Sequence, residues 1–153
     1  MGKIKIKEEA VTLDIINEML PLLELHRIEI SAFSDMKINV DAEKYVAMYN
    51  LHIYKLFVAR DETDSIVGYA GYYINNNMHY SDYVYATQDV IFVDKTERGA
   101  MLGSRIINYA DKVLLEADVN VVCHHVKVKH DFGELLKRNG YSLIEKIYMK
   151  RLK

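Results

Sequence analysis

The hydrophobic spacing of this chain changes several times along its length, and the order of these changes restricts the folds that it can adopt. Apolar residues recur at helical spacing over about residues 13–28 and again over residues 103–116. Between them lie three runs typical of strands, at residues 56–60, 66–74 and 83–93. The nearly continuous apolar run 119–126 is typical of a parallel strand buried on both faces. We therefore predict an α+β fold with a mixed, mostly antiparallel sheet flanked by helices.

Shorter segments complete the expected element order. Lys3–Lys7 alternates charged and apolar residues and indicates a first strand, while Pro21 should bend or split the first long helix. Asp41 is a candidate N-cap for a second helix. Residues 131–138 favour a short helix, and residues 142–152 favour a final strand or strand pair.

Length and composition exclude several classes of protein. The 153 residues suit one domain, so we treat residues 1–153 as a single unit. The lone cysteine, Cys123, excludes an intramolecular disulfide. The N-terminus lacks the apolar stretch of a signal peptide, and no apolar run approaches the roughly 20 residues that span a bilayer, so we expect a cytoplasmic protein without a membrane partner.

Charge is unevenly distributed along the chain. Residues 127–153 carry eight Lys or Arg against three acids, whereas the preceding residues carry twelve against nineteen. The net charge of −2 argues against a nucleic-acid partner. The asymmetry favours an anionic ligand near the C-terminal third and a cationic substrate elsewhere, although an ordinary solvated surface explains any single charge.

The segment from Asp89 to Arg105 carries the most chemistry. A predicted strand ends in a turn with two glycines, and an amphipathic helix begins at once. The first turn of a helix has unpaired N–H groups and a partial positive charge. Glycines there allow close approach of an anion, and Arg98 adds a fork of donors suited to phosphate. The segment predicts a pyrophosphate site at residues 98–104, unless the glycines serve only the backbone angles of a tight turn. It fits neither the P-loop nor the dinucleotide fingerprint.

The stretch from Val93 to Ser104 resembles the coenzyme A motif of the GNAT (GCN5-related N-acetyltransferase) family, roughly V-x-P-x-x-R-G-x-G-x-G. The matching positions are Arg98, Gly99, Leu102 and Gly103. Lys95 stands where proline is usual, and Met101 replaces the middle glycine.

A second segment, residues 129–141, resembles the family's N-x-x-A-x-x-L-Y-x-K-x-G-F. The matching positions are Leu135, Gly140 and Tyr141, and the departures are Lys129 for the asparagine and Leu136 for the tyrosine. The order of elements agrees over nearly the whole chain, and the sequence is similar to small phage-type GNAT proteins.

The resemblance implies an N-acetyltransferase that uses acetyl-CoA as cosubstrate, without a metal, and acts on an amine of a small molecule or protein. The backbone of Ile91 and Val93 would hold the pantetheine arm. The pyrophosphate would lie on Arg98, Gly99, Ala100, Met101, Leu102, Gly103 and Ser104. The acceptor stays open among polyamines, amino sugars, amino acids and protein lysines, and a homodimer is one candidate assembly.

Direct attack on a thioester requires a neutral amine, and a positioned base typically accelerates such a step about 10²–10⁴-fold. Asp89, four residues before Val93, is the first candidate base, with a structural or substrate-orienting carboxylate as the equal alternative. Gln88 points to the opposite face of the strand, and a bulge would change which of the two faces the substrate.

Other catalytic candidates come from the C-terminal third. His124 is a candidate base or acid, with a hydrogen-bonded core histidine as the more common alternative. In the family, a tyrosine at position 136 protonates the leaving thiolate. Leu136 cannot, so Tyr141, Tyr148 or water would act instead. The histidines lack recognisable metal-ligand spacing. Met101 and Leu136 also motivate the alternative of an inactive GNAT-fold protein that binds coenzyme A or a protein partner.

Overall fold

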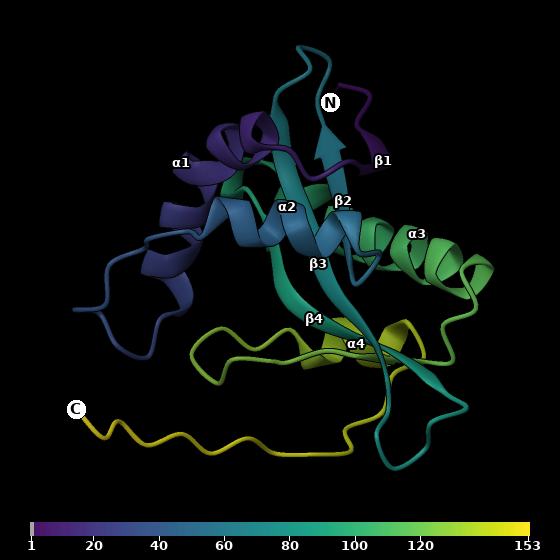
Figure 1. Ribbon diagram of the computed structural model, residues 1–153. Coiled ribbons are helices and arrows are strands. Elements are labelled where there is room, and N and C mark those ends of the chain that lie inside the picture. The colour runs from purple at the N-terminus through teal and green to yellow at the C-terminus, as the bar shows by residue number, and fades with distance from the viewer. Residues whose placement is uncertain (1) are drawn as a thin grey trace.

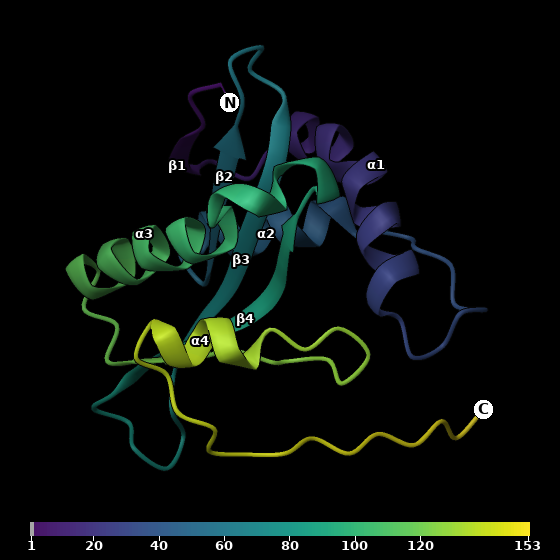
Figure 2. The same cartoon turned by 180° about the vertical axis from the view of Figure 1, so that it is seen from behind.

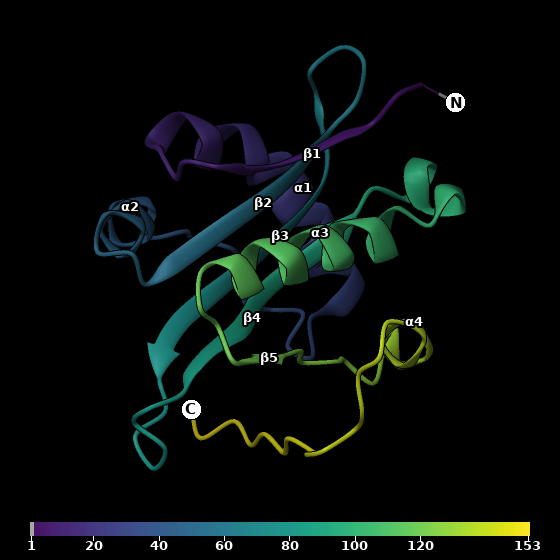
Figure 3. The same cartoon turned by 90° about the vertical axis from the view of Figure 1, so that its right-hand side faces the viewer.

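The computed structural model describes residues 2–153, apart from the side chain of Ala100. Its centre is a five-stranded sheet in the order β1-β2-β3-β4-β5. Figure 1 labels the first four strands, and Figure 3 also labels β5. The strands are β1 (Lys5–Glu9), β2 (Tyr54–Arg60), β3 (Ile66–Asn76), β4 (Val84–Val93) and β5 (Val121–Cys123). The first four pair antiparallel, and β5 lies parallel to β4. The predicted α+β fold with a mostly antiparallel sheet is confirmed.

Helices cover both faces of the sheet. They are α1 (Leu13–Ile30), α2 (Ala42–Asn50), the 3₁₀ helix η1 (Lys95–Ala100), α3 (Leu102–Glu116) and α4 (Gly133–Arg138). Helices α1 and α2 lie on one face and α3 and α4 on the other, as the opposite views in Figures 1 and 2 show. The edge-on view in Figure 3 separates the two helical layers.

A hydrophobic core lies on each side of the sheet, because alternate residues of a strand point to opposite faces. On β2, Leu56 and Val58 pack under α1, while Phe57 and Ala59 pack under α3. In α3 the residues Leu102, Ile106, Ala110 and Leu114 are fully buried at a spacing of four. The strand β2 is thus packed on both of its faces.

Helix α1 is continuous through Pro21, so the predicted split is wrong. Pro21 is exposed, while apolar residues before and after it pack on the sheet, including Ile16, Met19 and Leu23. This packing outweighs the helix-interior cost of proline, which is about 3 kcal/mol. The predicted cap of α2 is confirmed, since Asp41 accepts a 3.1 Å hydrogen bond from the Lys44 N–H.

The predictions about the C-terminal part are only partly correct. The run 119–126 contains a strand parallel to β4, as predicted, but this strand, β5, has three residues and is partly exposed because it is the edge of the sheet. Residues 142–152 form no strand, which makes the second prediction wrong. They form an extended segment that runs to the C-terminus (Figure 1). An edge of three residues gives a further strand little to pair with. No helix in residues 2–153 is long and apolar enough to cross a membrane.

Candidate active site

A bulge in β4 determines which side chains face the helices α1 and α2. Gly71 of β3 pairs with Val90, but the next residue, Tyr72, pairs with Gln88, so Asp89 is the extra residue. Alternation is therefore interrupted, and Asp89 and Val90 both line a cavity on the α1/α2 side. Gln88 instead faces the α3 side, where it contacts His124.

Three tyrosine hydroxyls donate hydrogen bonds to the Asp89 carboxylate. Oδ2 accepts from Tyr45 of α2 at 2.7 Å and from Tyr54 of β2 at 2.9 Å, and Oδ1 accepts from Tyr73 of β3 at 3.0 Å. Burial, followed by the nearby Asp89 charge, raises the pKa of Tyr45 and Tyr54. These hydroxyls therefore stay protonated and act as donors at neutral pH.

The rings of this tyrosine cluster also support one another. Tyr54 meets Tyr45 and Tyr73 edge to face, with ring centroids 5.1 and 5.3 Å apart. Tyr54 crosses β3 at Gly71, where a Cβ atom would lie 2.0 Å from the Tyr54 hydroxyl. Glycine at this position therefore allows a residue two strands away to reach Asp89.

The cavity beside Asp89 has a volume of about 590 Å³. Its aliphatic and methionine lining comes from α1 and the segment before it, the loop before α2, α2 itself and the sheet: Val11, Ile16, Met19, Leu23, Ile38, Val40, Met48, Leu56 and Val90. Its polar lining, besides Asp89 and the three tyrosines, is limited to Asn39, Asp41 and Lys44, which are all exposed.

The strands β4 and β5 diverge just beyond the bulge. Their pairing covers only residues 85–87 of β4, opposite 121–123. The Asp94 N–H donates to Val67 on β3, so the backbone groups of Ile91 and Val93 point to the opposite edge, away from β3. Ile91 and Val93, which were predicted to hold the pantetheine arm, thus direct backbone groups toward the edge of β4 that no longer pairs with β5.

The turn from β4 into α3 keeps space for a ligand. A Cβ atom on Gly99 would meet no described atom within 4 Å. Met101 adopts the left-handed backbone conformation at φ 54°, and its side chain is 66% exposed. The first turn of α3, with Gly103 in it, supplies the N–H donors expected of a helix N-terminus. The side chain of Ala100, another predicted contact, lies outside the described part.

Arg98 does not present a free guanidinium to this turn. Its Nε donates to the Val93 carbonyl at 3.0 Å, and its Nη2 donates to Glu29 of α1 at 2.8 Å. Its guanidinium also lies over the Phe92 ring. The Arg98 guanidinium, predicted to donate to phosphate, therefore instead links the end of β4 to α1 in this structure.

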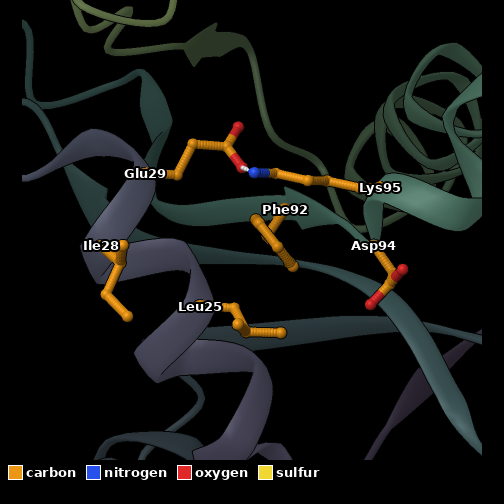
Figure 4. A pocket seen from close by; sticks show the side chains of 6 residues that line it. All are labelled: Leu25, Ile28, Glu29, Phe92, Asp94 and Lys95. Atoms are coloured by element: carbon orange, nitrogen blue, oxygen red, sulfur yellow. Dashed lines mark ion pairs between the residues drawn. The ribbon is translucent and has the colours of Figure 1, made fainter.

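Glu29 is the acidic centre of a basic cluster. Its carboxylate lies 3.0 Å from His130 Nε2 and 3.9 Å from Lys95 Nζ, in addition to the contact with Arg98. Burial raises the pKa of Glu29, but Arg98, together with His130 and Lys95, outweighs burial and holds it below its usual value. Glu29 and Lys95 also line a second cavity, which has a volume of about 260 Å³. Figure 4 shows them with the other lining residues, Leu25, Ile28, Phe92 and Asp94.

The other predicted side chains lie on the α3/α4 side. Ser104 donates through Oγ to Asn139 at 2.8 Å, which joins α3 to the end of α4. Tyr141 donates to Asp111 at 2.5 Å, and its ring centroid lies 4.9 Å from that of His124. Burial lowers the pKa of His124 to about 4, so the ring is neutral at neutral pH. The structure therefore brings His124 and Tyr141 together but places Asp89 on the opposite face of the sheet.

Sequence reasoning missed the tyrosines around Asp89 and the role of Glu29. Twelve tyrosines with no tryptophan were a compositional signal of polar-tipped aromatic surfaces. Nothing in their spacing indicated that three of them converge on one carboxylate. Among residues 2–153, no group of three or more His, Cys, Asp or Glu side chains is arranged to hold a metal ion.

Comparisons with known proteins agree with this geometry. Residues 22–132 match the model of the acetyltransferase (GNAT) family. A solved acetyltransferase from Trypanosoma brucei superposes with a TM-score of 0.76 at 16% identity, covering 98% of this chain and 100% of that chain. No curated protein sequence matches the chain.

Two further solved structures are similar to the chain. An aminoglycoside acetyltransferase from an uncultured soil metagenomic sample, in complex with sisomicin, has a TM-score of 0.72 at 19% identity and 97% coverage of both chains. A ribosomal-protein-alanine N-acetyltransferase from Brucella melitensis biovar Abortus 2308 has a TM-score of 0.74 at 14% identity, with 99% of this chain and 100% of that chain covered. At these identities the likeness establishes the fold.

Proposed function

This chain belongs to the acetyltransferase (GNAT) family, and from that premise we propose that it transfers an acetyl group from acetyl-CoA to an amine. The observation that carries the proposal is the bulge in β4. It places the Asp89 carboxylate in a cavity at the point where β4 and β5 separate, four residues before the end of the strand that leads through η1 into α3.

The residues present fit acetyl-CoA. The backbone groups of Ile91 and the N–H of Val93 would hold the pantetheine arm, because they face the edge that β5 leaves open; the Val93 carbonyl already accepts a hydrogen bond from Arg98. The turn at residues 98–104 would hold the pyrophosphate through backbone N–H groups, with Lys95 as an exposed cation beside it. The open space at Gly99 leaves room for the approach of an anion.

When bound, acetyl-CoA supplies the acetyl thioester: a C–N bond to the amine forms, the C–S bond breaks, and the proton that the amine loses is balanced by one that the departing sulfur gains. Asp89 accepts the proton of the incoming amine, directly or through a water. The tyrosine hydroxyls hold the carboxylate in one orientation throughout. Tyr141 or water is the candidate for the proton donor to sulfur, because the His124 ring beside Tyr141 is neutral at neutral pH and has no acidic proton to give.

The departures from the family motif are compatible with activity. Met101 retains its backbone N–H and turns its side chain into solvent. Leu136 is buried in the core and leaves the proton-donor role to another group. A homodimer, a cytoplasmic location and the likeness to phage-type proteins stay predictions from the sequence.

Calorimetric titration with acetyl-CoA tests the proposal directly. We expect micromolar binding by the native chain, loss of binding in Gly103→Glu, and retention in Gly103→Ala. A Cβ at Gly103 would lie 3.5 Å from Leu135, an ordinary contact, so the alanine variant isolates the effect of the added carboxylate. Absence of binding in native protein with an intact circular dichroism spectrum would overturn the proposal.

A further inference from the structure

The cavity beside Asp89 has a chemistry that selects among amines. We propose that it binds a primary monoamine with an apolar body, such as an alkylamine or arylalkylamine, with the amino group at Asp89. This assignment of substrate class rests on the proposed acetyl transfer and goes beyond it.

The walls of the cavity are mainly apolar. Nine of its sixteen lining residues are aliphatic or methionine, and three more are the tyrosines whose hydroxyls are already bonded to Asp89. A volume of about 590 Å³ lies in the range of pockets that enclose small organic ligands. A ligand body that fills this space gains free energy by removing apolar surface from water.

Charge in the cavity is concentrated at one position. Asp89 is the partly buried carboxylate of the lining, while Asp41 and Lys44 are exposed and of opposite sign. A polyamine would leave its second ammonium group without a comparable partner inside the cavity. The hydroxyls of an amino sugar would lose water against aliphatic walls, at a cost for each group that is not hydrogen-bonded.

The hydrogen bonds of Asp89 leave room for a single donor. A carboxylate has about four acceptor positions. Tyr45 and Tyr54 occupy two on Oδ2, and Tyr73 occupies one on Oδ1. One position on Oδ1 remains for an N–H of the amine. The surrounding tyrosine rings favour a cation on approach, before the proton is given up.

Ile38 offers a way to change this selectivity without disturbing the core. It lines the cavity from the loop before α2 and is 37% exposed. Met36 lies in the same loop, is 48% exposed and does not line the cavity. Ile38→Asp would add a second carboxylate to the wall, and Met36→Asp adds the same charge outside it.

The experiment measures acetyl transfer by native protein to hexylamine, phenethylamine, hexanediamine, spermidine and sisomicin. We expect kcat/KM for the two monoamines to exceed that for the other amines by about tenfold or more, the range that burial of a few methylene groups supplies. Ile38→Asp should lower the ratio of hexylamine to hexanediamine activity by about tenfold, and Met36→Asp should leave the ratio unchanged.

Preference for spermidine or sisomicin in the native protein, with acetyl-CoA bound, would overturn the substrate class and leave the acetyl transfer intact. Failure of acetyl-CoA binding would overturn the proposed function instead. Direct calorimetric binding of hexylamine to native protein and to Asp89→Asn then still tests the cavity. Binding that is lost in the variant supports the assignment, and no binding to the native protein overturns it.

Discussion

Tyr54 and Asp89 lie two strands apart in the sheet, yet the Tyr54 hydroxyl donates a 2.9 Å hydrogen bond to the Asp89 carboxylate. The intervening strand contributes Gly71, whose missing side chain opens the path. The orientation of the candidate base therefore depends on a residue that does not contact it.

We expect Gly71→Ala to destabilise the protein and to impair acetyl transfer. The new Cβ would overlap the Tyr54 hydroxyl, and overpacking of this kind costs about 1–3 kcal/mol. Urea unfolding measures the loss. Gly99→Ala is the matched control, because its Cβ meets no described atom within 4 Å. Equal stability of the two variants would contradict the proposed steric role of Gly71.

Acidification should destabilise the protein through two histidines. Burial lowers the pKa of both His26 and His124 to about 4, from an ordinary 6.5. Between these values the unfolded chain binds more protons than the folded chain. The stability that depends on the neutral rings is complete above pH 6.5 and falls as the pH drops toward 4.

From pH 7 to pH 5 we expect each ring to contribute a loss of about 2 kcal/mol in the free energy of unfolding. Urea titrations at the two pH values measure the sum. His26→Gln cannot titrate, so its loss over the same interval should be about half that of the native chain. An unchanged pH dependence in this variant would exclude His26 as a contributor.

Periodicity predicted most of the fold because α3 and the central strands bury regular apolar faces. It failed at Pro21, where tertiary packing prevails over local propensity, and in residues 119–126, where apolar composition alone does not show that a strand is an edge. Asp89 could be proposed from the sequence because its distance from the coenzyme motif is local in sequence. The three tyrosines were not, since a bulge and a glycine on another strand bring them together.

The stability of the protein should depend on the residue type at position 101, in the turn before α3. Met101 has a φ of 54°, which costs a residue with a Cβ about 1 kcal/mol or more. We expect Met101→Gly to be more stable than Met101→Ala by roughly that amount, because both remove the exposed side chain and only glycine is free of the strain. Thermal unfolding of the two variants measures the difference, and a more stable alanine variant would contradict the left-handed conformation.

Removal of residues 142–153 should leave the fold nearly intact. The apolar side chains of this segment are mostly exposed, as for Ile144 at 82% and Tyr148 at 89%. Its main described contact with the domain is the ion pair of Arg151 with Asp35, and an exposed pair of this type contributes about 1 kcal/mol or less. Urea unfolding of the chain that ends at Tyr141 tests this. A loss of several kcal/mol would contradict the view that this segment contributes little to the fold.

Glu29→Gln should tighten the binding of acetyl-CoA. The Glu29 carboxylate now neutralises Arg98 and lies near Lys95, so its removal increases the positive potential next to the proposed pyrophosphate turn. Glutamine preserves the shape and can still accept a hydrogen bond from Arg98. We expect a gain of about three- to tenfold in affinity at low salt, which corresponds to the interaction of partly exposed charges.

Calorimetry at two ionic strengths identifies the cause of this gain. Because dissolved ions screen charges over about 10 Å at 0.1 M salt, the advantage of the variant should shrink as salt increases. Glu24→Gln is the control, since Glu24 lies on the same helix but pairs with Arg27. If Glu29→Gln weakens binding while Glu24→Gln does not, then Glu29 holds Arg98 in a position that the coenzyme requires, and the electrostatic account is wrong.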